Sequence, residues 1–292
     1  MHTVAKSYFE AFAVDDPARR ETAGVWRFDR LSGKSKIIGV NDSEVVNDIY
    51  TVYDENGTPD AGIETILCKI EGAFGDARRA LLDRGTLVHK EIPLTKEQWT
   101  GIATFIAAQL LRTPRFFQMM RDYLTAGRLP CECDSPQRVM LTLIDRWIPR
   151  LVRMHGLLVY TETDLPLLTS DNPAVTWKKN GNGFICGVNQ RDPELVISCP
   201  LAPELLYVAY QTQESLNAVH AERYDIPRAE RKSEMFRSNL TLGSIPEREV
   251  KRLNHLCLLN AHEHVYANYC DKALLRLLQS RFWGHKALYE KA

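Results

Sequence analysis

The period of the hydrophobic pattern changes several times along this chain, and these changes limit its fold more than any other feature. β-branched and aromatic residues gather at 25–30, 34–40 and 48–54, as is typical of strands. A Ser-Gly pair separates the first two segments and favours a tight turn. The N-terminal part therefore predicts a β-hairpin followed by a third strand.

The next segments have a helical period. Apolar residues recur every three to four positions from 61 to 84 and again from about 95 to 112, where Thr95 is a good N-cap. Pro114 is expected to kink the second helix or to end it near Arg112 and Thr113. A third helix is predicted at about 136–154.

The second half repeats this order of strands and helices. Two apolar runs in 157–177 predict a β-hairpin, and 194–211 predicts two further strands. The charged stretch 217–237 is either a solvated helix or a loop, and 246–280 predicts a long final helix. The order predicts a single α+β domain over 1–292, in which N-terminal and central segments form an antiparallel sheet packed with long helices.

Charge and cysteine content exclude several classes of protein. Lys and Arg total 37 and Asp and Glu total 37, so the chain has no overall field to attract nucleic acid or an anionic membrane. Seven cysteines, an odd number scattered through apolar runs, are typical of reduced thiols rather than a disulfide framework. We see no signal peptide and no apolar run of about 18 residues. We therefore expect a cytoplasmic protein without a membrane partner.

The common cofactor and nucleophile motifs are absent from the sequence. We find no Walker loop, GxGxxG, GxSxG or HExxH pattern. His262 and His264 are two positions apart on the predicted final helix, so they point in different directions and do not share a zinc ion.

A row of arginines lies on one side of the helix predicted at 136–154. Arg146, Arg150 and Arg153 follow a helical spacing. We expect a solvated face that pairs with Asp145, in preference to a contact with nucleic acid.

A dispersed set of polar residues in apolar surroundings is the remaining candidate for a site. A His, carboxylates and an Arg together can move protons, hold Mg²⁺ and stabilise an anionic transition state. The alternative is structural: solvent-facing carboxylates, an Arg that caps a helix, and an Asx-turn before Pro173. The set comprises His2, Glu64, Glu71, Arg112, Ser170, Asp171 and Asn172.

The same residues carry a resemblance to the bacterial domain-of-unknown-function family 4238 over nearly the whole chain. The matching segments are His2–Phe12, Asn47–Tyr50, Ile63–Glu64, Ile70–Gly72, Arg112–Pro114, Leu168–Val175, Pro200–Pro203 and Asn260–Ala267. Two positions depart from the family pattern: Met1 replaces the first His of a usual pair, and Ala5 replaces a Pro. The resemblance implies that the polar set recurs as a group, which favours a site over packing, but it implies no activity.

Our leading hypothesis is a metal-assisted phosphodiester hydrolase, such as a nuclease effector of a bacterial defence or toxin system. Its metal ligands for Mg²⁺ or Mn²⁺ are Glu64, Glu71 and Asp171. Its catalytic residues are His2, Glu71 and Arg112, and its substrate contacts are Tyr8, Ser170 and Asn172.

Two further hypotheses stay open. The first is a transferase or glycohydrolase acting on NAD or a nucleotide, which needs a His and a Glu but no metal. The second is a non-enzymatic sensor or partner-binding module, in which the polar set forms a buried structural network.

Overall fold

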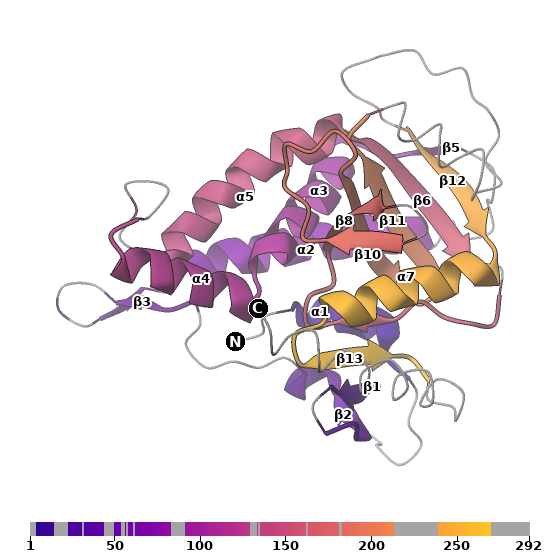
Figure 1. Ribbon diagram of the computed structural model, residues 1–292, viewed down its shortest axis with the longest axis horizontal. Coiled ribbons are helices and arrows are strands. Elements are labelled where there is room, and N and C mark those ends of the chain that lie inside the picture. The colour runs from indigo at the N-terminus through magenta and orange to yellow at the C-terminus, as the bar shows by residue number, and fades with distance from the viewer. Residues whose placement is uncertain are drawn as a thin grey trace.

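A seven-stranded sheet forms the centre of the protein, in the order β5-β12-β6-β11-β10-β8-β9 (Figure 1). The computed structural model describes residues 4–14, 23–30, 32–43, 50–53, 56, 58–60, 62–82, 91–128, 133, 135–161, 163–180, 183–212 and 239–269. The strands of this sheet are β5 (Glu91–Pro93), β6 (His155–Thr161), β8 (Val175–Asn180), β9 (Gly183–Cys186), β10 (Val196–Ala202), β11 (Leu205–Tyr210) and β12 (Asn239–Ile245). Its neighbours pair antiparallel, except β12 and β6, which run parallel.

Helices cover both faces of this sheet (Figure 1). Residues of α2 (Gly62–Leu82), α3 (Lys96–Leu111) and α5 (Pro136–Arg153) share one core with one face, and α3 packs against both α2 and α5. Residues of α7 (Glu247–Asn260) pack against the other face. All six residues of β11 are buried, because a strand covered on both faces is apolar throughout.

A smaller sheet joins distant parts of the chain in the order β2-β1-β13-β7. The N-terminal hairpin of β1 (Gly24–Asp29) and β2 (Ser35–Gly39) pairs through β1 with β13 (His264–Ala267). β13 in turn pairs with the short central strand β7 (Thr169–Ser170). The remaining elements are α1 (Lys6–Phe9), η1 (Glu10–Phe12), η2 (Val40–Asp42), β3 (Val52–Tyr53), β4 (Pro59–Asp60) and α4 (Pro114–Thr125).

The mixed α+β class and the three internal helices are confirmed. Thr95 caps α3 as expected: its Oγ1 accepts a hydrogen bond from the Gln98 N–H, and the Gln98 side chain accepts one from the Thr95 N–H. Helix α3 ends shortly before Pro114, and Pro114 is itself the first residue of the next helix, α4. Proline is tolerated in the first turn of a helix because an N–H at that position has no acceptor within the helix.

Two predictions of local structure are wrong. The segment 157–177 is not a hairpin, because β6 pairs with β11 and β12 whereas β8 pairs with β10 and β9. The helix predicted at 246–280 ends at Asn260, and His264–Ala267 is a strand. The expected antiparallel sheet of N-terminal and central segments is present as the smaller sheet, in which β13 lies between β1 and the central strand β7.

Some expectations are not decided by the fold. The stretch 217–237 and His2 lie outside the described residues. None of the described helices is both long and apolar enough to cross a lipid bilayer.

Candidate functional site

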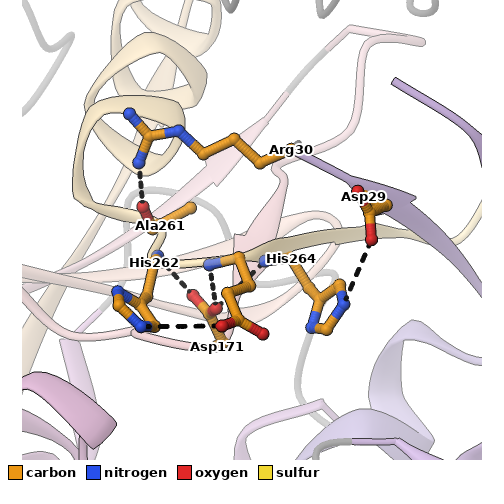
Figure 2. Close-up of polar contacts among 7 residues, drawn as sticks. Asp29, Arg30, Asp171, Ala261, His262 and His264 are labelled. Carbon is orange, nitrogen blue, oxygen red and sulfur yellow. Dashed lines mark hydrogen bonds and ion pairs between the residues drawn. The ribbon is translucent and has the colours of Figure 1, made fainter. Parts of the chain in front are cut away.

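The carboxylate of Asp171 is buried and holds the turn between α7 and β13 (Figure 2). Its Oδ1 accepts the backbone N–H of His262 at 2.8 Å, and its Oδ2 accepts those of Glu263 and His264 at 2.5 and 3.0 Å. The side chain of Asp171 is only 2% exposed. Three hydrogen bonds to one buried carboxylate make this residue a clamp between segments about 90 positions apart in sequence.

Neighbours of Asp171 strengthen the same connection. Ser170 Oγ accepts the Asn172 N–H and donates to the Asn172 carbonyl. The amide of Asn172 donates to the Asn260 carbonyl at 3.4 Å, and the Asn260 amide donates to the Asn172 carbonyl at 3.1 Å. The turn is therefore built on the Ser170 hydroxyl and is attached to the end of α7. The Asx-turn expected at Asp171 and Asn172 is wrong, because both Asp171 oxygens accept N–H groups of residues 262–264 instead.

Two residues that the sequence did not single out complete this region. Arg30 donates to the Ala261 carbonyl at 2.5 Å, and Asp29 Oδ2 lies 3.8 Å from His264 Nε2 (Figure 2). Asp29 and His264 face each other because they are register partners in the β1–β13 pair. No local pattern reveals this contact, since more than 230 positions separate the two residues.

A second polar cluster forms where α2 meets the end of α3. Arg112, the C-cap of α3, donates from Nη1 to Glu71 Oε1 at 2.6 Å and from Nε to the Tyr50 hydroxyl at 3.1 Å. Its guanidinium carbon lies 5.0 Å from the centroid of the Tyr50 ring. The side chains of Arg112 and Glu71 are 3% and 21% exposed. The pair is thus internal at the Arg112 end and reaches solvent at the Glu71 end.

Both partners of the cluster keep Arg112 charged. Burial alone disfavours the guanidinium charge, but Tyr50 and Glu71 raise the pKa of Arg112 above its ordinary value. Burial also raises the pKa of Tyr50, against the opposing effect of Arg112. Tyr50 therefore remains a neutral phenol that accepts a hydrogen bond from a cation.

Glu64 lies on the same side of α2 as Glu71. Seven positions along one continuous helix return to nearly the same direction. Burial raises the pKa of Cys68, and the charges of Glu71 and Glu64 raise it further. The two carboxylates therefore lie in line along α2.

The three carboxylates expected to hold a metal do not form one group. In the part of the chain that the structure describes, no three His, Cys, Asp or Glu side chains lie together so as to hold an ion. Both Asp171 oxygens accept backbone N–H groups, whereas Glu64 and Glu71 belong to α2. The polar set is thus divided between two places in the fold.

Tyr8, expected at a substrate site, lies in the core. Its hydroxyl donates to the Pro200 carbonyl at 2.6 Å and contacts Thr169 Oγ1 at 2.7 Å. Its ring stacks on Phe105, and the residue has no exposed surface. Burial raises the pKa of Tyr8 well above its ordinary value, so the phenol stays neutral. Tyr8 therefore joins α1 to β7 and β10.

The buried thiol of Cys257 gives a prediction for alkaline pH. Burial raises its pKa from 9.0 to about 12, so above pH 9 the unfolded chain loses a proton that the folded chain keeps. The resulting stabilisation is full below the unfolded pKa and is lost as pH rises toward the folded one. Between about pH 8 and pH 10.5 this single group should remove about 2 kcal/mol from the free energy of unfolding. Urea unfolding of the wild type and Cys257→Ala measures the difference, and equal losses in both proteins would contradict it.

Comparison with known proteins places the chain in a family. The family model described as "Protein of unknown function (DUF4238)" matches residues 1–271. No curated protein and no solved structure matches the chain. The match covers most of the sequence, including both polar clusters. This chain belongs to the DUF4238 family, as its sequence motifs predicted.

Proposed function

We propose that this protein is a non-enzymatic binding module, in which the polar set stabilises the fold. The observation that supports this most is the pairing of its charged members inside the protein. Asp171 accepts three backbone N–H groups, and Arg112 donates to Glu71 and Tyr50. A buried charge is tolerated when such partners compensate for the lost hydration.

A metal ion or substrate that bound these charged side chains would have to displace the hydrogen-bond partners that they already have. A metal ion or substrate at Asp171 would compete with the N–H groups of His262, Glu263 and His264. Each hydrogen bond to a charged group contributes about 1.5–3 kcal/mol. The clamp between β7 and the α7–β13 turn would be lost at the moment of binding, which favours a structural role.

Thermal unfolding of variants tests this proposal. Glu71→Gln, Arg112→Ala and Asp171→Ala should each lower the melting temperature. Glu71→Gln removes the negative charge that faces the buried Arg112, and the two alanine variants remove hydrogen bonds to buried groups. Removal of a catalytic group often has the opposite effect, since active sites store electrostatic strain. Unchanged or raised melting temperatures in all three variants would reject the proposal.

A phosphodiester hydrolase is the second candidate. It is supported by Glu64 and Glu71, which lie in line on one side of α2, and by the charged Arg112 bound to Glu71. In that scheme the two carboxylates hold Mg²⁺ or Mn²⁺, Arg112 neutralises the phosphate and His2 moves protons. Asp171 takes no part, because its oxygens serve the turn.

A cleavage assay separates the two candidates. End-labelled RNA, single-stranded DNA and duplex DNA are incubated with the protein in Mg²⁺, Mn²⁺ or EDTA. The binding-module proposal expects intact substrates in every condition. Metal-dependent cleavage that is lost in Glu71→Gln and kept in Asp76→Asn would establish the hydrolase instead. Asp76 is a suitable control because it lies on α2 and is highly exposed. Circular dichroism at the assay temperature shows whether Glu71→Gln is folded.

A further inference from the structure

Four charged side chains are buried among the residues that the structure describes: Arg78, Arg112, Asp171 and Glu249. Arg112 and Glu249 have ion-pair partners, and Asp171 accepts three backbone N–H groups. Arg78 is only 7% exposed, yet within the described part of the chain it forms no ion pair and donates one hydrogen bond. It is therefore the one buried charge in that part that the protein itself leaves without compensation.

The guanidinium of Arg78 is held by α1 and by an aromatic ring of α2. Its Nη1 donates to the Tyr8 carbonyl at 3.1 Å, and its Cζ lies 5.6 Å from the centroid of the Phe74 ring. Phe74 stacks in turn on Phe105, with ring centroids 3.7 Å apart. These contacts place the positive charge at the junction of α1 and α2, against a rigid part of the core.

One edge of this guanidinium has no acceptor. Arg78 Nε is buried without a hydrogen-bond partner, and no described residue accepts from Nη2. The N–H groups of Nε and Nη2 point in the same direction and form an edge that can contact two oxygens of one carboxylate or phosphate. The hydroxyl of Ser7, next to Tyr8 in α1, is also buried without a partner. The junction thus contains unused donors beside a buried positive charge.

Burial acts against the charge of Arg78. It lowers the pKa of Arg78, and the negative charge of Glu10 opposes this effect. Glu10 is exposed, however, and its carboxylate forms no ion pair with the guanidinium. Because an arginine stays charged at neutral pH, its burial costs free energy unless an anion lies beside it.

Exposed arginines need no such partner, because water hydrates their charge. Arg146 and Arg153 on α5 are exposed, as expected of a solvated face. Within the described ranges neither pairs with Asp145, so the pairing expected from the sequence is wrong. Residues 145 and 146 are adjacent and point about 100° apart on the helix. Arg78 differs from these arginines because it has little contact with water.

We propose that Arg78 binds an oxyanion, the carboxylate or phosphate group of a small molecule, at the junction of α1 and α2. The proposal rests on the role as a binding module and names the chemistry of its ligand. Two oxygens of the anion accept from Nε and Nη2, and its charge balances Arg78 as Glu71 balances Arg112. Because the side chain is so little exposed, the bound group is small or is the end of a larger molecule.

Thermal unfolding with added anion tests this site. The full chain is melted in Tris chloride with sodium phosphate or sodium acetate, from about 0.1 to 10 mM at constant ionic strength. At a dissociation constant of about 1 mM, 10 mM of the bound anion should raise the melting temperature by about 3–5 °C. A rise with phosphate alone or with acetate alone identifies which oxyanion the site takes. Arg78→Met removes the charge and should weaken binding at least about tenfold, which abolishes the rise.

The neighbouring arginine gives a matched control. Arg79 is highly exposed and pairs with Asp76, so Arg79→Gln should keep the rise of the wild type. Arg78→Lys keeps the charge but loses the two-point contact, so it should bind the anion more weakly than wild type. No rise in wild type with either anion, or equal rises in wild type and Arg78→Met, would overturn the proposal. Should Arg78→Met not fold, equal rises in wild type and Arg78→Lys would do the same. The module proposal is tested separately, because the stabilities of the Glu71, Arg112 and Asp171 variants are measured without added anion.

Discussion

Asp171→Ala is expected to lower the free energy of unfolding by about 3–5 kcal/mol. The variant removes three hydrogen bonds to a carboxylate that is 2% exposed. Each such bond contributes about 1.5–3 kcal/mol, but the sum is reduced because the turn is partly open to water. His262 and Glu263 have side chains 47% and 56% exposed, which shows that solvent reaches them.

Urea unfolding followed by tryptophan fluorescence measures this loss. Asp171→Asn should lose at least half as much stability as Asp171→Ala, because its amide group would face N–H donors rather than accept from them. Asp164→Asn is the matched control, since Asp164 is exposed in the same connection between β6 and β7 and should change stability by less than about 0.5 kcal/mol. A similar, small effect at Asp171 and Asp164 would show that the clamp does not stabilise the fold.

Arg112→Ala is expected to cost about 3–5 kcal/mol, through lost packing and a broken internal ion pair. Its side chain is 3% exposed and lies against the ring of Tyr50. Removal leaves Glu71 near the surface, where water can hydrate the carboxylate, and leaves the buried Tyr50 hydroxyl without its cation. The same unfolding assay measures the loss.

Substitutions of Glu71 test the same ion pair from its acidic side, and Glu64 on the same helix is the control. Glu71→Leu removes the carboxylate partner of the buried Arg112 charge, so it should destabilise by several kcal/mol. Glu71→Gln keeps an acceptor oxygen and should cost less, about 1–2 kcal/mol. Glu64→Gln removes the same charge from the same side of the helix and should be nearly neutral. Equal effects at Glu71 and Glu64 would contradict the assigned role of the ion pair.

Local signals allowed much of the helical structure to be predicted. The apolar period of α2, the N-cap Thr95 of α3 and the limits of α5 depend on residues close in sequence. The hairpin of β1 and β2 was predictable for the same reason, because a short turn joins its strands. Pairings between distant strands were not, and the segment 157–177 shows why: β6 and β8 are apolar runs that each find partners elsewhere.

The end of α7 illustrates a competition that the sequence pattern does not show. Apolar residues continue at a helical spacing beyond Asn260, so the period alone predicts a longer helix. Asp171 instead accepts the N–H groups of residues 262–264, and His264–Ala267 pairs with β1 and β7. A tertiary contact therefore ends the helix where local propensity would continue it.

The candidate site was predictable in composition but not in arrangement. Sequence motifs identified Glu71, Arg112 and Asp171, and all three are held by internal partners. Their partners Tyr50 and the turn at 262–264 lie tens of positions away, so no local spacing reveals them. Local spacing also does not show which distant residues meet. Glu64, Glu71 and Asp171 were therefore expected at one metal site, whereas the structure places the first two on α2 and Asp171 at the end of β7.

A double-mutant cycle on Glu71 and Arg112 tests the central claim most directly. The free energies of unfolding of wild type, Glu71→Gln, Arg112→Ala and the double variant give the coupling between the two side chains. A structural ion pair, 2.6 Å long and mostly buried, predicts a coupling of at least about 1.5 kcal/mol, with both single variants less stable than wild type. A coupling below about 0.5 kcal/mol, with single variants as stable as wild type, would contradict a structural role and return these residues to candidates for catalysis.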